Sequence, residues 1–201
     1  KKDQEFMNKM YLLTTRAIDD TLKDCKILKH RYINAIASPS MRVSKNSIII
    51  NKDYDGIFLT SRNAAHIIKI LKNKKTPIFC VGSSTAKLAR FYGAKNLIVG
   101  NSDSLFLAKK INYTLPKNSN ILWPSNNTLK DDIYNTIKAN LNYIDKKIVY
   151  SNLPLEKIDE NSLNLITKKQ VSVVLFFSFK STQMWIELIN KSNLFKFLEN
   201  I

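Results

Sequence analysis

The sequence predicts an α/β protein of two similar lobes, each with a parallel sheet and covering helices of the flavodoxin or Rossmann type. One observation is a repeated unit of hydrophobic strand, serine turn and amphipathic helix, which occurs at 56–71 and again at 173–189. Ser61 and Ser178 stand at equivalent points of the two copies, and their separation is too long for a solenoid repeat. The other observation is the alternation of apolar strands with short amphipathic helices along the chain, which is typical of βαβ units.

The first part of the chain already shows this alternation. Asp19, Asp20 and Thr21 provide acidic and capping residues where the first helix begins. Ser38-Pro39-Ser40 interrupts the chain, and Gly93 is expected to cap a helix at its C-terminal end. The expected elements are strands at 11–15, 32–37, 47–51, 57–60, 77–81 and 96–99, helices at 19–29, 63–72 and 103–111, and a helix that follows 82–85 and runs to 91.

The second part of the chain repeats this order. The expected elements are strands at 121–123, 147–150 and 171–177, helices at 129–140, 160–166 and beyond 178, a polar loop at 124–128 and a break at 151–154. Residues 11–71 and 121–189 thus follow one scheme, but nothing after 190 corresponds to the further strands and helix at 78–99. We therefore expect the C-terminal lobe to be incomplete. The polar residues 1–8 are left out of the predicted fold.

Composition and charge limit the classes of function. With 44% apolar residues the chain is typical of a globular protein, and its longest apolar run, 171–179, is expected to be a buried strand rather than a membrane span. The net charge of +16 favours nucleic acid or a polyanionic small molecule as partner, or reflects a lysine-rich composition alone. Because the lysines form scattered pairs, expected mostly at helix ends, we expect no nucleic-acid partner. The pairs are Lys74-Lys75, Lys109-Lys110, Lys146-Lys147 and Lys168-Lys169.

Residue types that carry redox, metal or cofactor chemistry are isolated in this chain. Cys25 and Cys80 have no metal-ligand spacing, which suits small buried side chains in a reducing cytoplasm. His30 and His66 stand alone, and His66 is expected on the surface of the helix that follows Ser61. The four glycines are too scattered to form a dinucleotide-binding loop. We therefore expect neither a cofactor nor a metal.

Short motifs carry a resemblance to a known family. They are Phe58-Leu-Thr-Ser61-Arg-Asn-Ala-Ala65, Val81-Gly-Ser-Ser-Thr85-Ala-Lys-Leu-Ala89 and Ile148-Val-Tyr150, and Leu13-Thr-Thr-Arg16 precedes them. In the order and spacing of these motifs, the chain resembles the uroporphyrinogen-III synthases over about residues 10–190.

The resemblance implies a fold with two α/β lobes, a two-stranded β connector and an active site between the lobes. Lobe 1 would take 10–38 plus 155–201, the connector 39–51 and 151–154, and lobe 2 the residues 52–150. The departure from the family is the missing unit after residue 190, which in the family supplies a threonine to the site.

The resemblance also implies an activity. The family converts hydroxymethylbilane into uroporphyrinogen III, with loss of water and inversion of ring D through a spiro intermediate. This is a cofactor-independent hydro-lyase reaction of heme biosynthesis in the cytoplasm. We accordingly expect a monomer whose partner is this polycarboxylate and which binds neither nucleic acid nor membrane.

The eight carboxylates of that substrate change the interpretation of the polar turns. The start of a helix presents unpaired backbone N–H groups and a partial positive charge, which suit an anion. Arg16, at a strand end, is expected to bind a carboxylate or else to be a plain surface arginine. Substrate binding is also expected at Ser61, Arg62, Asn63, Ser84, Thr85, Ser125, Asn126 and Ser178, although each could simply cap its own helix.

Tyr150 matches a tyrosine in the family's site and is the expected catalytic residue. Its phenol would help the substrate hydroxyl to depart as water, and the alternative is a tyrosine that only packs where the lobes join. Three other classes of function stay open, and one is a flavodoxin-like flavin protein, which would be coloured when purified. A non-catalytic two-lobed binder of an anionic small molecule would form no cyclised product, and a basic nucleic-acid-binding α/β protein would show strongly salt-sensitive binding.

Overall fold

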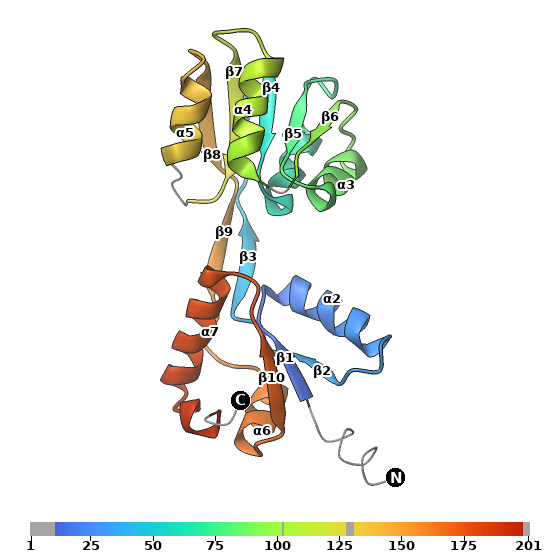
Figure 1. Ribbon diagram of the computed structural model, residues 1–201, viewed down its shortest axis with the longest axis vertical. Coiled ribbons are helices and arrows are strands. Elements are labelled where there is room, and N and C mark those ends of the chain that lie inside the picture. The colour runs from blue at the N-terminus through green and yellow to red at the C-terminus, as the bar shows by residue number, and fades with distance from the viewer. Residues whose placement is uncertain (1–10, 102, 128–130, 199–201) are drawn as a thin grey trace. The chain divides into compact units, whose positions relative to one another are not determined.

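The computed structural model describes residues 11–101, 103–127 and 131–198 of the 201-residue chain (Figure 1). The segment 1–8, Thr128 and the first residues of the helix predicted at 129–140 lie outside the described residues. The chain forms two compact units, Lys1–Val43 with Asn152–Ile201 (unit 1) and Ser44–Ser151 (unit 2). The α/β class with parallel sheets is confirmed, and each unit is described below by itself.

Unit 2 contains a five-stranded parallel sheet in the order β6-β5-β4-β7-β8. Its strands are β4 (Gly56–Leu59), β5 (Ile78–Cys80), β6 (Leu97–Val99), β7 (Asn120–Ser125) and β8 (Tyr143–Ile148). All four residues of β4 are buried, because a central strand of a doubly covered sheet has no solvent-facing side.

Helices cover both faces of this sheet. They are η1 (Arg62–Ile70), α3 (Ser83–Phe91), α4 (Ser104–Thr114) and α5 (Asp131–Lys138). Phe58, Phe79 and Trp123 pack with apolar residues of α4 and α5 in one core. Ile57 and Leu59, which alternate with Phe58 along the strand, are also fully buried, and η1 and α3 pack against each other.

The helix predicted at 63–72 is a 3-10 helix rather than an α-helix. Its buried positions recur every three residues, since Ala64 and Ile67 form one pair and Ala65 and Ile68 another. This spacing matches three residues per turn, and the apolar pattern alone did not distinguish it from the α-helical period.

Unit 1 contains, among its described residues, a three-stranded parallel sheet in the order β10-β1-β2. Leu13, Ile166, Trp185 and Ile189 lie at the centre of its apolar core. The strands are β1 (Tyr11–Thr14), β2 (Ala35–Ala37) and β10 (Val171–Leu175), and the helices are α2 (Ile18–Lys29), α6 (Glu160–Thr167), α7 (Phe179–Lys191) and η2 (Phe195–Phe197).

Two further strands, β3 (Met41–Lys45) and β9 (Tyr150–Pro154), pair with each other. The Asn46 N–H donates to the Val149 carbonyl at 2.9 Å, and the Leu155 N–H donates to the Ser40 carbonyl at 3.1 Å. Because the partner number falls as the residue number rises, the two strands are antiparallel.

The positions of these two strands correct the sequence-based expectation. The strand predicted at 47–51 is wrong, because the strand lies at Met41–Lys45. The break predicted at 151–154 is also wrong, since these residues belong to β9, and the strand predicted at 147–150 is divided between β8 and β9. Pairing between segments distant in sequence decides these strands, and local β propensity does not reveal it.

Three smaller expectations also need correction. The cap of α2 is Ala17 and makes no side-chain hydrogen bond, so Asp19 and Asp20 bring acidic charge to the first turn without capping it. β2 begins at Ala35 rather than at residue 32. The apolar run 171–179 is a strand only as far as Leu175, and the aromatic residues after it are exposed.

Four helices end in the same backbone motif, in which one residue takes a left-handed conformation. These residues are Tyr32 (φ 60°), Gly93 (φ 97°), Lys169 (φ 53°) and Asn193 (φ 53°). In each case the next residue's N–H donates back to a helix carbonyl, in the pairs Ile33–Leu28, Ala94–Ala89, Gln170–Leu165 and Leu194–Ile189. Glycine is the usual residue at this position, and of these four helices only α3 has one.

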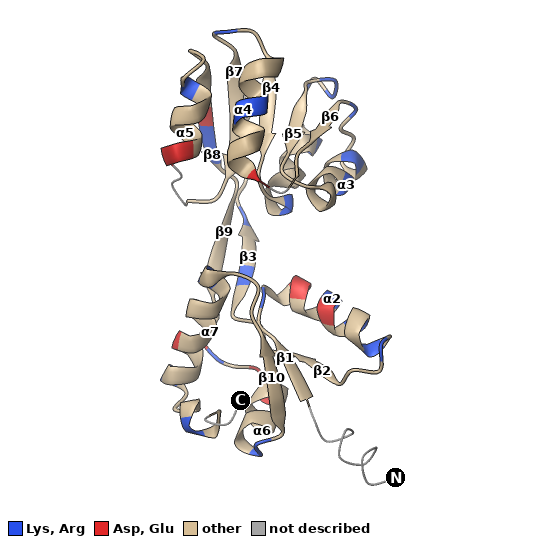
Figure 2. Ribbon diagram, in the orientation of Figure 1, with Lys and Arg blue, Asp and Glu red and all other residues tan. Residues whose placement is uncertain are grey.

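Basic residues are spread over the helices and loops of each unit (Figure 2). Cations do occupy the last turns of several helices, among them Lys29 in α2 and Lys138 in α5. The predicted location of the lysine pairs is only partly right. Lys168-Lys169 follows α6, but Lys109-Lys110 lies inside α4 and Lys146-Lys147 lies in β8.

The two cysteines are free, as the sequence predicted. Cys80 is fully buried in β5, and burial raises the pKa of its thiol to about 12. Cys25 is only half-buried in α2, so the expectation of a buried side chain is only partly right there. Burial nevertheless raises the pKa of the Cys25 thiol above its ordinary value, which disfavours the nucleophilic thiolate.

Candidate functional site

The strand order of unit 2 reverses at β4, with β5 and β6 on one side and β7 and β8 on the other. In open parallel sheets, ligands bind outside the carboxyl ends of the strands at such a switch point. The chain leaves β4 through Thr60 and Ser61, β5 through Val81 and Gly82, and β7 through Asn126. Three of the predicted polar turns therefore follow strands at or beside this point.

Ser61 is the N-cap of η1. Its backbone is extended, with φ −145°, and its hydroxyl oxygen accepts a hydrogen bond from the Asn63 N–H at 3.2 Å. The predicted cap is thus present. The hydroxyl hydrogen and the other N–H groups of the first turn are the groups that this turn can offer an anion.

Thr60 is a neighbour that the sequence-based prediction missed. The Trp123 indole N–H donates to the Thr60 hydroxyl at 3.3 Å, which ties the end of β4 to β7. Trp123 is 2% exposed, and Phe58 lies with its ring centre 5.5 Å away. The contact joins residues far apart in the chain, so only Thr60's place in the motif around Ser61 could have indicated it.

Ser84 and Thr85 differ in accessibility. Both lie in the first turn of α3, whose N-cap, Gly82, has no side chain to contribute. Ser84 is exposed, whereas Thr85 is 3% exposed. The Thr85 side chain therefore packs inside unit 2, and only Ser84 can reach a ligand with its hydroxyl.

Ser125 and Asn126 lie at the end of β7, and only Ser125 departs from the predicted position. β7 continues through Ser125, which pairs with Ile148 and is 6% exposed, so the loop predicted at 124–128 starts later. Asn126 follows the strand and is half-buried, and the described part of α5 starts at Asp131. Ser125 therefore lies in the strand rather than in the predicted loop, and Asn126 follows the strand beside the switch point.

Unit 1 has its own switch point, between β1 and β10. The Thr15 hydroxyl donates to the Leu175 carbonyl at 2.8 Å, and the Ser40 hydroxyl donates to the Thr15 carbonyl at 2.8 Å. These two hydrogen bonds fix the end of β1, from which Arg16 projects.

Arg16 already has acidic partners. Its guanidinium lies 3.3 Å from a carboxylate oxygen of Asp20 and 3.5 Å from one of Asp24, and it stacks on the Phe177 ring at 4.7 Å. Two carboxylates beside one guanidinium leave the group net negative. A substrate carboxylate would therefore have to displace one of these aspartates. Nothing in the sequence indicated that Arg16 has these partners.

Ser178 is the N-cap of α7, as Ser61 is of η1. Its hydroxyl oxygen accepts from the Ser181 N–H at 3.3 Å and lies 2.9 Å from the Ser181 hydroxyl. Ser178 itself is exposed. The equivalence of Ser61 and Ser178 that the repeat predicted is confirmed as a shared capping role.

Tyr150 is the first residue of β9 and is 6% exposed. The predicted catalytic phenol is therefore a buried side chain. His66, by contrast, is half-buried, and its Nδ1 lies 2.9 Å from the Asn63 carbonyl, so this nitrogen carries the proton and donates.

A charged cluster that the sequence did not predict joins the segment before β4 to the edge strand β8. The Tyr54 hydroxyl donates to Asp145 at 2.5 Å, and the ammonium groups of Lys52 and Lys147 lie 3.3 and 3.4 Å from the same carboxylate. Burial alone would raise the pKa of Asp145, but these hydrogen bonds and the Lys147 charge lower it overall. Burial and the same hydrogen bond raise the pKa of Tyr54.

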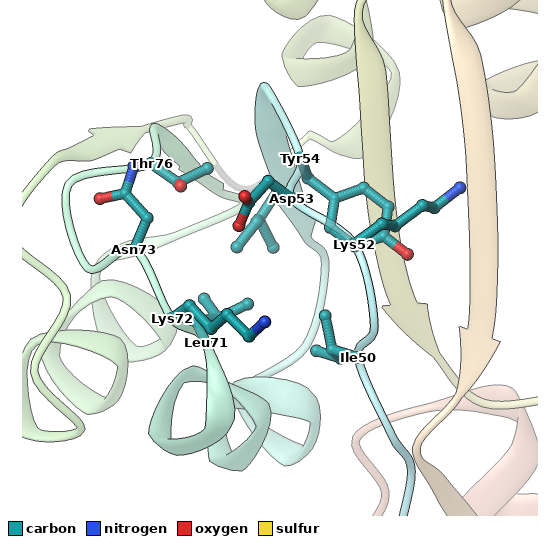
Figure 3. A pocket seen from close by; sticks show the side chains of 9 residues that line it. Ile50, Lys52, Asp53, Tyr54, Leu71, Lys72, Asn73 and Thr76 are labelled. Atoms are coloured by element: carbon teal, nitrogen blue, oxygen red, sulfur yellow. The ribbon is translucent and has the colours of Figure 1, made fainter.

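A small pocket lies beside this cluster (Figure 3). Its lining residues are Ile50, Lys52, Asp53, Tyr54, Ile57, Leu71, Lys72, Asn73 and Thr76. It has room for about one water molecule and lies before the start of β4, away from the carboxyl ends of the strands. We therefore assign the cluster a structural role, in which it holds the segment before β4 against β8.

Two other kinds of site are absent from the described ranges. No group of three or more His, Cys, Asp or Glu side chains there could hold a metal ion. No helix in the described part of the chain is long and apolar enough to cross a membrane.

Taken together, the sheets, the capped turns at their switch points and the β3–β9 pair define a two-unit, parallel α/β protein. The family model described as uroporphyrinogen-III synthase HemD matches residues 26–201. The chain belongs to the uroporphyrinogen-III synthase family.

Solved structures with the same fold come from this family. The chain is similar to a mutant uroporphyrinogen III synthase of the extreme thermophile Thermus thermophilus, with 12% identity and a TM-score of 0.57 over 94% of this chain and 81% of that one. It is also similar to uroporphyrinogen-III synthetase of Helicobacter pylori, with 13% identity and a TM-score of 0.55 over 89% and 78% of the two chains. At these identities the likeness concerns the fold. Curated protein sequences gave no match to the chain.

Proposed function

We propose that this chain catalyses the cyclisation of hydroxymethylbilane to uroporphyrinogen III, with loss of water and inversion of ring D. The observation that carries the proposal is the family match over residues 26–201. The sequence motifs around Ser61, Thr85 and Tyr150 point to the same family independently of the structure.

In this proposal the substrate carboxylates bind at helix starts. The first turns of η1, α3 and α7 are capped by Ser61, Gly82 and Ser178, and each first turn contains N–H groups without a helical partner. Arg62, Asn63, Ser84 and Asn126 would add side-chain donors around the unit 2 switch point. Backbone N–H groups would carry most of the binding, because the Ser61 and Ser178 hydroxyls are already engaged as caps.

Tyr150 is proposed to assist departure of the hydroxyl group. Its phenol would donate a proton or hydrogen bond to the leaving oxygen, and a buried position strengthens such a hydrogen bond because little water competes. The loss of water leaves an electrophilic azafulvene, which the substituted carbon of the terminal ring then attacks to form the spiro intermediate.

Orientation is the main contribution to rate in this mechanism. Holding two reacting parts of one substrate in the productive geometry can supply roughly 7–11 kcal/mol. The protein therefore needs no strong acid–base pair, but it must hold the chain of four pyrroles so that ring D attacks through the substituted carbon. Simple closure of the unbound substrate would give the type I isomer.

The direct test is incubation of the purified chain with hydroxymethylbilane, followed by separation of the type I and type III isomers after oxidation to porphyrins. We expect type III as the main product, against type I alone in a control with heat-denatured protein. Only type I in both samples would reject the proposal. Tight binding of the substrate without type III would instead identify a non-catalytic binder.

A further inference from the structure

An exposed aromatic patch follows β10, where the sequence predicted a buried strand. We call Phe176, Phe177 and Phe179 the aromatic patch, and their exposed fractions are 42%, 50% and 86%. Large apolar side chains gathered on a surface commonly mark a binding site, whereas single exposed ones need no explanation. None of the three residues belongs to the core cluster of unit 1, although Phe176 contacts Trp185 of that cluster.

The patch lies at the switch point of unit 1, and two of its rings pack against other side chains. Arg16, at the end of β1, stacks on Phe177 at 4.7 Å, and Trp185 packs edge-on against Phe176 with ring centres 5.5 Å apart. Trp185 in turn donates to the buried Ser38 hydroxyl at 2.9 Å. Two of the three rings therefore have a fixed partner and still expose about half of their surface.

Groups suited to an anion stand directly beside these rings. Ser178 lies between Phe177 and Phe179 in sequence, is exposed, and caps α7, a helix of 13 residues. The backbone N–H groups at positions 179 and 180 are in the first helical turn, where no helical partner is available. The surface thus combines aromatic faces with an anion-binding end, which is the chemistry of a flat ring bearing carboxylates.

We propose that the aromatic patch binds a pyrrole ring of the tetrapyrrole through Phe177 and Phe179, while the start of α7 takes a carboxylate of the same ring. This assignment rests on the proposed function, since it names the part of unit 1 that recognises the substrate. Phe176 packs against Trp185, and the proposal does not require it to contact the pyrrole ring.

The first test compares steady-state kinetics of variants. In Phe177→Ala/Phe179→Ala we expect the KM for hydroxymethylbilane to rise about tenfold, with kcat changed by less than about twofold, because stacking acts on binding. The matched control is Phe195→Ala, which removes a 58% exposed phenylalanine from the same unit and should leave both constants unchanged. An unchanged KM in the double variant would overturn the proposal.

The second test measures ligand binding in the absence of turnover. The chain has two tryptophans, so in Trp123→Phe the fluorescence comes from Trp185 alone. Uroporphyrin III, used as the probe, should quench this emission, and Phe179→Ala should weaken the binding several-fold while the thermal midpoint stays the same. Phe179 is 86% exposed, so this single variant is expected to fold normally.

The outcomes separate this proposal from the proposed function. If the chain forms no type III product but Phe179→Ala still weakens probe binding, the synthase assignment fails and the patch stands as a tetrapyrrole site. If type III forms and the variants bind and react like the parent, the patch proposal is wrong. A dimer in light scattering that Phe177→Ala/Phe179→Ala dissociates, with KM unchanged, would assign the patch to a second copy of the chain and overturn it as well.

Discussion

At the scale of single residues, the site depends on groups whose partners are already fixed. Ser61 and Ser178 accept hydrogen bonds from their own helices, and Arg16 is paired with two aspartates. These side chains therefore act first on the local structure. In the proposed function, only their remaining donor groups would be free to contact substrate. The capped backbone is the more dependable donor.

The Ser178→Ala variant tests this division of roles. Loss of the cap should lower the free energy of unfolding by about 1 kcal/mol. Turnover should stay within about twofold, because the N–H groups of the first turn are unchanged. Urea unfolding and a standard assay measure the two quantities, with Thr182→Ala as the control in the same turn. A large loss of activity without loss of stability would show that the hydroxyl itself binds substrate.

Tyr150→Phe tests the catalytic proposal. Removing the phenol should lower kcat by at least about tenfold and leave KM nearly unchanged, because proton donation contributes to the transition state and not to binding. Stopped or quenched assays of type III formation provide the measurement. Tyr143→Phe makes the same chemical change at a 61% exposed position of β8 and should be silent. Full activity in Tyr150→Phe would remove this residue from the mechanism.

Asp145→Asn tests the charged cluster with Tyr54, Lys52 and Lys147. The pKa of Asp145 is lowered in the fold, so its contribution to stability is present above the ordinary carboxyl pKa of about 4 and is lost as pH falls through the lowered value. We expect the variant to be less stable by about 1 kcal/mol at neutral pH, with the difference shrinking in acid. Denaturant unfolding at a series of pH values measures this, and Asp53→Asn, an exposed neighbour, should show no such dependence.

At the scale of elements, local sequence pattern predicted most strands and helices but not the pairing between distant segments. Val171–Leu175 and Gly56–Leu59 were predictable because a run of apolar residues bounded by turns leaves few alternatives. The β3–β9 pair was misplaced, because its position is set by contacts between residues more than 100 positions apart. The Trp123–Thr60 and Tyr54–Asp145 contacts were missed for the same reason.

The helix ends allow a test in which substitutions at two equivalent positions should change stability in opposite directions. Lys169 and Gly93 both occupy the left-handed position after a helix. Lys169→Gly should stabilise the protein by about 0.5–1 kcal/mol, because the strain of a side chain there exceeds the entropy that glycine loses on folding. Gly93→Ala should destabilise it by a similar amount, since nothing crowds a Cβ at that position and only backbone strain remains. Thermal and urea unfolding measure the stability of both variants. A change in the same direction in both would contradict this expectation.

At the scale of the whole molecule, the two units have separate cores. Trp123 lies in the core of unit 2 and Trp185 in the core of unit 1, and no described residue belongs to both clusters. The sequence predicted two lobes from its internal repeat, which works because both copies follow the same strand, turn and helix order.

This separation predicts unfolding in two steps. Trp123→Phe leaves an indole that reports on unit 1, and Trp185→Phe leaves one that reports on unit 2. We expect their fluorescence midpoints in urea to differ, with unit 2 unfolding at the higher concentration because its sheet has more strands. Circular dichroism of both variants checks that each substitution keeps the fold. Coincident midpoints would mean that the units unfold cooperatively.

The composition of the unit 1 sheet has a consequence for biosynthesis. β1 pairs with β2 on one side and with β10 on the other, and β10 is translated only after all of unit 2. Chains emerge from the ribosome N-terminus first, so unit 2 can fold before β10 has been made. During that time the edge of β1 that later pairs with β10 is unpaired. An unpaired edge strand is prone to pair with other chains, and slow elongation through residues 44–151 would therefore prolong the period of greatest aggregation risk.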